Sequence, residues 1–320
     1  MKKTLLAIAV LAASGAAFAQ SSVTLYGRAD IGLTKITDSS VALQDGASVG
    51  TSSRIGFRGV EDLGGGLKAS FLVEAGYRAD ANTGATTLGS RNSYIDLSGG
   101  FGTVRLGRHL NPALLIAATH GGAWGTDYGQ ASNSNIMSIE GARYNNAMSY
   151  MSPDFGGITV MLTTATKEAD TYAVNSLAGT GAVAATKMPF ATLIAYKGGP
   201  ILAHLALTKN GRGGEKLLTQ VGATYDAGVV KASLLVEQDA NQVGGKNAYS
   251  LGLTAPLGAS KLQFTYGKDQ KGTAADVTQL AVGGQYDLSK RSNIYGYVAQ
   301  LKSAGATAVN QVTFGVQHSF

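Results

Sequence analysis

Five arginines stand where they could act on a charged solute rather than on a covalent bond. They are Arg28, Arg54, Arg58, Arg105 and Arg143. A guanidinium is a permanent cation with five N–H donors, so a group of them attracts and orients anions. Two acids between the last two arginines, Asp127 and Glu140, could supply the opposite end of an electric field. The chemistry indicated is electrostatic selection of ions.

Residue patterns for hydrolytic, metal or thiol chemistry are missing from the sequence. The chain has no Cys, which excludes thiol nucleophiles, disulfides and Cys-ligated zinc. Its four histidines, His109, His120, His204 and His318, are scattered and form neither an H-E-x-x-H motif nor a paired-His metal spacing. There is no G-x-S-x-G motif either. We therefore expect no enzymatic activity, no cofactor, no metal and no nucleic-acid partner.

The first 19 residues have the features of a cleaved export signal. Lys2 and Lys3 precede the apolar residues 5–13, and Ala17-Phe18-Ala19 has the small-x-small form of a cleavage site. The apolar stretch is too short to remain as a membrane helix, which needs about 20 residues. Residues 1–19 are predicted to be removed, leaving 20–320 as one domain.

Segments of about ten residues beyond this signal alternate apolar residues with polar or small ones. In the last segment Val312, Phe314 and Val316 fall on one face, and Gln311 and Thr313 fall on the other. Side chains of a strand alternate between its two faces, so each segment has an apolar side and a polar side. The charged fraction is only 14%, well below the roughly 25% of a soluble domain.

Two kinds of connection separate these segments. About seven short turns rich in Gly, Asp and Pro, such as residues 61–66, alternate with about eight looser and usually longer loops. A soluble β-sandwich also has alternating strands, but nothing in it would segregate the connections in this way. Lipid offers no hydrogen bonds, so a sheet in a membrane must close on itself. The sequence predicts an all-β fold, a 16-stranded antiparallel transmembrane β-barrel, with short turns at one rim.

One connection, residues 110–142, is much longer than a hairpin needs. It opens with Asn111-Pro112, a good N-cap followed by proline at the first helical position, and Gly121-Gly122 end the apolar stretch. The predicted short helix gives the loop an apolar face to pack against a wall, so we expect the loop to fold inward and narrow the pore. The alternative is an outward surface loop. Trp124 is expected to pack within this loop.

Strand alternation also predicts which arginines line the pore. Apolar residues such as Leu25, Phe57 and Leu106 would face lipid, which turns the arginines of their strands inward. The predicted basic wall consists of Arg28, Arg54, Arg58 and Arg105, with Arg143 at the start of the next strand. Asp127 and Glu140 on the loop would face this wall.

The basic wall would favour anions, because rings of Arg or Lys do so and low-dielectric walls focus their field. The alternative is that each arginine is a rim charge paired with a carboxylate such as Glu61, Asp62 or Asp96. Arg108 is off the parity of its strand and is assigned to the rim.

Six ordered motifs resemble the Gram-negative porin family, in particular the β-proteobacterial general porins of the Neisseria, Bordetella, Burkholderia and Comamonas type. They are SSVTLYGRADIGL after the signal, GFRGVEDLGGGLKA at 56–69, GGFGTVRLGR at 99–108, YMSPDFGG at 150–157, YDLSKRSNIY at 286–295 and GVQHSF at 315–320. The resemblance covers essentially the whole mature chain. It implies a sixteen-stranded barrel whose third extracellular loop folds inward.

The same resemblance implies a homotrimer in the outer membrane, surrounded by lipid and lipopolysaccharide. Phe320 would be the C-terminal residue that the outer-membrane assembly machinery recognises. The implied function is passive diffusion of small hydrophilic solutes and ions. Because the long loop holds only two acids, we expect weak to moderate anion preference.

Three alternatives to this function are a substrate-specific channel, a barrel enzyme and a structural or adhesive anchor. A substrate-specific channel would usually line its pore with an aromatic track, and the sequence shows no such run. A barrel enzyme would need Asp, His or Ser groups at strand ends. A structural or adhesive anchor would need a passenger domain that these loops are too short to supply.

Overall fold

The computed structural model describes residues 22–46, 49–81, 87–137, 142–166, 187–211, 216–238, 247–270 and 275–320. The predicted signal at residues 1–19 lies outside these residues, and so does Glu140. None of the helices in these ranges is long and apolar enough to cross a membrane.

Within the described ranges, seventeen strands form a single sheet in which every neighbouring pair is antiparallel. The strands are β1 (Ser22–Ile36), β2 (Ala42–Asp45), β3 (Arg54–Gly64), β4 (Leu67–Gly76), β5 (Asn92–Gly99), β6 (Gly102–Leu110), β7 (Arg143–Met151), β8 (Ile158–Ala165), β9 (Phe190–Gly198), β10 (Ile201–Lys209), β11 (Leu218–Asp226), β12 (Lys231–Gln238), β13 (Asn247–Leu257), β14 (Ser260–Asp269), β15 (Val277–Asp287), β16 (Ser292–Ser303) and β17 (Val309–Ser319). The helices in this part of the chain are α2 (Pro112–His120), η1 (Gly129–Ala131) and η2 (Asn133–Asn135).

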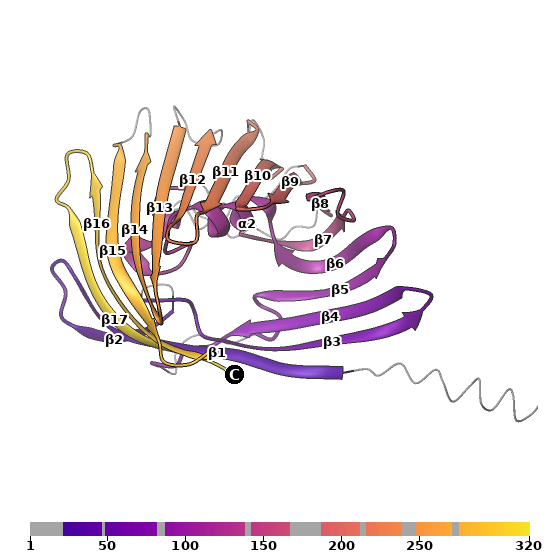
Figure 1. Cartoon of the computed structure of the whole chain (residues 1–320), viewed down its shortest axis with the longest axis horizontal. Helices are drawn as coiled ribbons and strands as arrows, with labels where there is room; N and C mark the ends of the chain where they lie inside the picture. The colour runs from indigo at the N-terminus through magenta and orange to yellow at the C-terminus, as the bar shows by residue number, and fades with distance from the viewer. Residues whose placement is uncertain are drawn as a thin grey trace, which may run out of the picture.

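The sheet closes because the first strand pairs with the last. In β1, Arg28 lies opposite Ser319 and Ile36 lies opposite Gln311 of β17. The C-terminus accordingly lies beside β1 (Figure 1). A closed ladder leaves no free strand edge, which is what a sheet in lipid requires. The predicted barrel is confirmed.

The strand count agrees with sixteen because β2 and β3 share one place in the barrel. Both pair with β1, which has Ile31 opposite Asp45 of β2 and Arg28 opposite Arg54 of β3. The second barrel strand is thus interrupted between Asp45 and Arg54, and residues 49–53 are the described part of the interruption that leads into β3. The alternation of apolar and polar residues does not predict this interruption.

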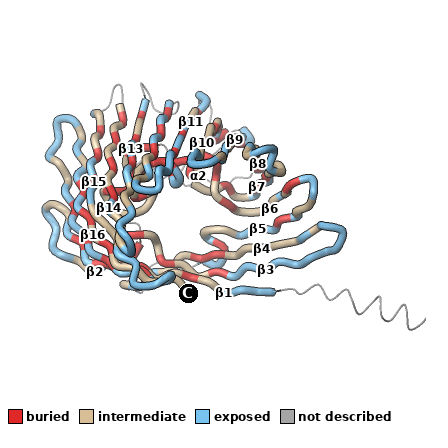
Figure 2. Tube along the Cα trace, viewed as in Figure 1, coloured by how far each residue is buried: buried red, intermediate tan, exposed pale blue. Residues whose placement is uncertain are grey.

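The strand alternation appears as one exposed face and one buried face. In β17 the side chains of Val312, Phe314 and Val316 are 56%, 56% and 44% exposed, whereas Gln311 and Thr313 are 1% and 3% exposed. Figure 2 shows this alternation of buried and exposed residues along the strands. Apolar side chains therefore face outward, where lipid takes the place of water, and polar side chains face inward.

Exposed aromatic side chains gather where the strands meet the short turns. Tyr150, Tyr225 and Tyr286 are 39%, 54% and 48% exposed and lie within two residues of the strand ends at this rim. Tyr and Trp are enriched at membrane–water interfaces because one part of the ring is apolar and the other is polar. This rim has the composition of a membrane interface.

The long loop begins with the helix that its sequence predicts. The side-chain oxygen of Asn111 accepts a hydrogen bond from the Leu114 amide at 2.7 Å, and Pro112 occupies the first helical turn. The helix α2 ends before Gly121, whose amide donates to the Ala117 carbonyl at 2.9 Å. Capping of this kind contributes about 1 kcal/mol to a short helix.

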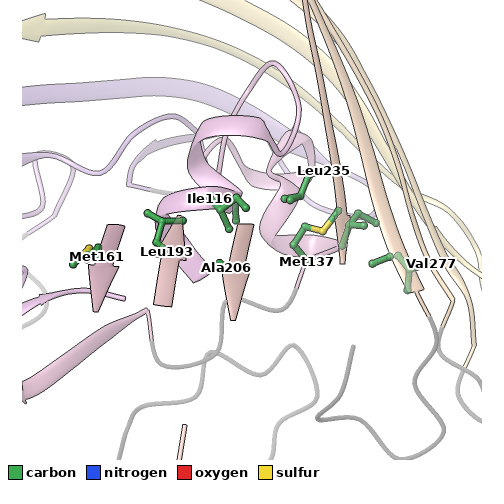
Figure 3. Close-up of a cluster of buried hydrophobic side chains, with 10 residues drawn as sticks. Ile116, Met137, Met161, Leu193, Ala206, Leu235 and Val277 are labelled. Carbon is green, nitrogen blue, oxygen red and sulfur yellow. The ribbon is translucent and has the colours of Figure 1, made fainter. Parts of the chain in front are cut away.

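The loop packs against the inner face of the wall. Ile116 of α2 points toward Leu193 and Ala206 of β9 and β10, while Met137 lies in the same buried cluster as Leu235 of β12 (Figure 3). In Figure 1 the helix α2 lies on the inner side of β10 to β12. Burial of the apolar face of α2 therefore holds the loop inside the barrel.

Two glycines of the wall make room for the loop. A Cβ atom added to Gly252 would lie 2.6 Å from backbone atoms of Gly122 and Ala123, and one added to Gly222 would lie 2.4 Å from the His120 ring. Separations below 3.0 Å force a shift of one of the two groups. Because glycine has no side chain, the loop backbone can lie directly on the sheet at these two positions.

Candidate functional site

Arg28 and Arg54 are cross-strand neighbours on the inner face of β1 and β3. Like charges placed directly opposite each other destabilise a sheet. The two guanidinium groups are held apart by different partners: Arg28 Nη1 donates to Thr51 Oγ1 at 2.9 Å, and Arg54 Nε donates to the Ser52 carbonyl at 3.2 Å. This pair destabilises the sheet, but it places two positive charges at the same level along the axis of the barrel.

Arg91 belongs to the same basic cluster, although the sequence analysis did not single it out. Its Nε donates to Glu74 Oε1 at 2.8 Å, and the same carboxylate accepts from Tyr26 at 2.9 Å and from Asn92 at 3.2 Å. Arg91 lies in the connection just before β5, where no strand alternation indicates which way a side chain points. Its only sequence signal is its place next to a strand.

Arg143 and Arg108 complete the positive side of the site. Arg143 opens β7 and lies within electrostatic range of Arg91, Arg54 and Arg108. Arg108 lies within the irregularity between Gly107 and His109 in the β6–β7 pairing, and its guanidinium donates to the side chain of Asn145.

Asp127 is the loop carboxylate that faces this cluster. Arg54, Arg91, Arg143 and Arg28 all act on it electrostatically. Burial raises the pKa of the Asp127 carboxyl above its ordinary value, and the four arginines oppose this shift. The structure thus brings three of the predicted arginines together with Asp127, whereas the other predicted acid, Glu140, lies outside the described residues.

Arg105 and Arg58 lie apart from this group. Arg105 makes two hydrogen bonds of 2.8 Å with Asp96 across the β5–β6 pair, and its guanidinium carbon lies 3.7 Å from the centre of the Tyr94 ring. Its charge is therefore compensated, as in the alternative that pairs arginines with carboxylates. Arg58 is exposed, with its guanidinium carbon 5.3 Å from the centre of the Tyr26 ring.

Two of the histidines described as scattered in the sequence are in fact in contact. His120 Nε2 on α2 lies 2.5 Å from His204 Nδ1 on β10, and His120 Nδ1 lies 2.7 Å from Thr224 Oγ1 on β11. The fold brings together residues 84 positions apart, which no spacing rule reveals. Among the residues that the structure describes, no group of three or more His, Cys, Asp or Glu could hold a metal ion.

Hydrogen bonds between uncharged groups attach the rest of the loop to β14, β15 and β17 of the wall. Thr265 Oγ1 accepts from the Ala123 amide at 2.8 Å, Gln311 Oε1 accepts from the Gln130 amide at 2.7 Å, and Gln279 Nε2 donates to the Gln130 and Ser132 carbonyls at 2.7 and 2.6 Å. Buried amide side chains need such partners, since an unmade hydrogen bond there costs about 1–3 kcal/mol. The loop is thus fixed across the lumen.

An aromatic group surrounds the loop beyond α2. Trp124 and Tyr128 of the loop pack on Tyr295 and Tyr297 of β16, with ring centres 5.2 Å apart for Trp124 and Tyr297 and 5.3 Å apart for Tyr128 and Tyr295. Trp124, Tyr295 and Tyr297 are at most 5% exposed. These rings pack the loop onto the wall.

A closed barrel with an apolar outside, a polar inside and a loop across its bore is the architecture of a transmembrane channel. The charged groups that face one another at the loop can act on a solute by charge.

Comparison with known proteins identifies the kind of channel. Residues 4–306 match the family described as Gram-negative porin. The chain is 37% identical to outer membrane porin protein 32 of Delftia acidovorans over 347 residues, covering 99% of this chain and 94% of that protein. It is 31% identical to an outer membrane porin protein of Bordetella pertussis, with all of both chains covered.

A solved structure agrees with these relatives. The anion-selective porin from Comamonas acidovorans superposes with a TM-score of 0.73 at 29% identity, covering 94% of this chain and 100% of that one. The chain belongs to the Gram-negative porin family. It is an outer-membrane channel, as the sequence motifs indicated.

Proposed function

We propose that the channel carries small hydrophilic solutes and ions by passive diffusion, with weak to moderate anion preference. The observation that supports this preference is that Arg28, Arg54, Arg91 and Arg143 all act electrostatically on Asp127, the carboxylate of the loop among the residues that the structure describes. Glu74, another acid nearby, forms an ion pair with Arg91 at 2.8 Å, so these two charges largely compensate each other and the preference depends mainly on Arg28, Arg54 and Arg143. The selectivity named for the Comamonas porin is consistent with this sign.

A Coulomb estimate gives the size of the effect. A unit charge about 8 Å from an ion in water changes the energy of that ion by about 0.5 kcal/mol, which is about twofold in local concentration. Anions are enriched and cations depleted by the same factor, so one arginine changes their ratio about fourfold at low salt. Screening reduces this factor at physiological salt.

Assembly follows the family pattern in the same proposal. The chain is exported with residues 1–19 removed, inserted through recognition of Phe320, and assembled as a homotrimer among lipid and lipopolysaccharide. The seat of Phe320 supports this role, because its backbone exchanges hydrogen bonds of 2.9 and 3.1 Å with Gly27 at the join of the barrel.

Reversal potentials in planar bilayers test the anion preference. In a KCl gradient the wild type should give the sign of a chloride-preferring pore, and Arg54→Ala and Arg143→Ala should each lower the chloride-to-potassium permeability ratio about two- to fourfold at low salt. The matched control is Arg291→Ala, which removes an exposed arginine of the β15–β16 turn and should leave the ratio unchanged.

Cation preference in the wild type, or an unchanged ratio in both pore variants, would overturn the proposal. Block of the current by one solute at low concentration would instead identify a substrate-specific channel.

A further inference from the structure

We propose that the interruption of the second barrel strand positions the arginines of the pore, and that Thr51 within it is a specificity-determining positioning residue. The inference rests on the anion preference proposed above, since it concerns how the arginines remain available to anions. Its central observation is that Thr51 stands between Arg28 and the buried carboxylate of Asp30.

Asp30 anchors the interruption to the wall. Its side chain is fully buried and accepts four hydrogen bonds from uncharged groups. Oδ2 accepts from the Thr51 amide at 2.7 Å, from Thr51 Oγ1 at 3.0 Å and from Gln317 Nε2 at 2.8 Å, while Oδ1 accepts from the Tyr295 hydroxyl at 2.6 Å. Hydrogen bonds to an ionised acceptor are about twice as strong as neutral ones, so the segment is firmly held.

The hydroxyl of Thr51 uses its full hydrogen-bonding capacity. A threonine hydroxyl has one donor and two acceptor sites. Thr51 Oγ1 donates to Asp30 and accepts from Arg28 Nη1 at 2.9 Å and from Gln317 Nε2 at 2.8 Å. Arg28 is therefore oriented by the Asp30 charge through Thr51 without forming an ion pair with it.

Other atoms of the segment act on Arg54 and on the loop. The Ser52 carbonyl accepts from Arg54 Nε, so the two opposing arginines are held by adjacent residues of the same segment. The Gly50 carbonyl accepts from the Tyr128 amide at 3.4 Å, next to Asp127 on the loop. The segment thus contacts both sides of the charged constriction.

Removal of the Thr51 hydroxyl should move charge without changing its total. In Thr51→Val, the Asp30 carboxylate loses one hydrogen-bond donor and the Arg28 guanidinium loses its acceptor. Each side chain can then replace the lost partner by bonding to the other. Direct pairing would then compensate Arg28, as Asp96 compensates Arg105. We expect the anion preference to fall although no charged residue has been altered.

Reversal potentials of the purified full chain in planar bilayers, at low salt, test this. Thr51→Val and Thr51→Ala should lower the chloride-to-potassium ratio in the same direction as Arg28→Ala, by up to about twofold, because charge is moved and not removed, whereas Arg28→Ala should lower it about two- to fourfold. Thr51→Ser retains the hydroxyl and should keep the wild-type ratio. Thr163→Val is the control, because it removes a buried hydroxyl away from the arginines, one that bonds Ser149 at 2.7 Å and lies on β8.

The outcomes separate this inference from the proposed function. A wild-type ratio in Thr51→Val and Thr51→Ala, with a lowered ratio in Arg28→Ala, would overturn the inference and leave the proposed function standing. A wild-type ratio in Arg28→Ala and Arg54→Ala as well would overturn both. Resistance of the unheated barrel to SDS shows which variants are folded, and Thr51→Ala, which adds no new atoms, serves if Thr51→Val does not fold.

Discussion

Arg54 and Arg105 both point into the lumen, yet they differ in how much charge they offer to a passing ion. Arg54 is held by the carbonyl of Ser52, a neutral acceptor, whereas Arg105 makes a two-point ion pair with Asp96. Strand parity predicts that both face inward, but it says nothing of which residue lies across the ladder. That partner depends on the register between β5 and β6, which places Asp96 opposite Arg105.

This difference can be tested with a charge-neutral double variant. Arg105→Gln combined with Asp96→Asn removes one charge of each sign, so the chloride-to-potassium permeability ratio should stay at its wild-type value. Arg105→Gln alone leaves Asp96 uncompensated and should lower the ratio about twofold in low salt. A double variant that remains as cation-shifted as the single one would show that Arg105 contributes to selectivity itself.

The position of the Arg91 side chain could not be predicted from the sequence either. It has the same partner carboxylate as Tyr26, which the alternation of the first strand already turns inward. Because Arg91 precedes its strand, no pattern of apolar neighbours fixes its direction. Only the folded connection brings it to Glu74.

The local structure of the long loop could be predicted from the sequence, but its contacts with the barrel wall could not. Asn111-Pro112 and Gly121 mark the start and end of α2, and the structure has both caps. The contact of His120 with His204 and Thr224 requires the curvature of the whole wall, so no local motif could predict it.

The same contact predicts a pH-dependent loop. The pKa of His120 is lowered to about 4 from an ordinary 6.5, first by burial and then by His204 and Lys231. The folded state therefore disfavours the charged ring. The contribution of His120 to the stability of the attached loop is complete above pH 6.5 and is lost as the pH falls toward about 4.

Trp124 reports on this change because it is the only tryptophan of the chain and lies buried in the same loop. Its fluorescence emission should shift to longer wavelength between pH 6.5 and 4 in the wild type. In His120→Asn, which has no titrating ring, this transition should vanish. Constant emission of the wild type across this range would contradict the prediction, and the same scan on His318→Asn controls for loss of an exposed histidine.

Closure of the barrel is the property of the whole molecule that the sequence predicted most firmly, since a sheet in lipid must not expose an edge. The interruption between β2 and β3 was missed because residues 46–53 have the Gly- and Ser-rich composition of any loop. Sequence composition does not distinguish a segment that leaves the barrel from one that turns into it. Pairing of β1 with both β2 and β3 reveals the difference.

The join between β1 and β17 predicts a stability defect at Gly27. A Cβ atom there would lie 2.3 Å from the Phe320 ring and 2.7 Å from the Arg54 carbonyl. Gly27→Leu should displace the ring and destabilise the join by about 1–3 kcal/mol, as overpacking usually does. The temperature at which the barrel loses its resistance to SDS should fall.

Ala29→Leu provides the control for this prediction, because it adds a leucine at the next outward position of β1, opposite His318. Equal heat resistance of Gly27→Leu and the wild type would show that the ring does not secure the join.

The loop is attached to the wall by hydrogen bonds between uncharged groups, so salt can weaken the electrostatic effect of the arginines without changing the width of the pore. The screening length shrinks from about 10 Å in 0.1 M salt to about 3 Å in 1 M salt, so the influence of the arginines on a passing ion fades in brine. The hydrogen bonds of Gln279 to the Gln130 and Ser132 carbonyls are short and join uncharged groups, so their strength changes little with ionic strength. A cell moving from fresh water to a saline habitat would keep the same sieve while its electrical bias disappears.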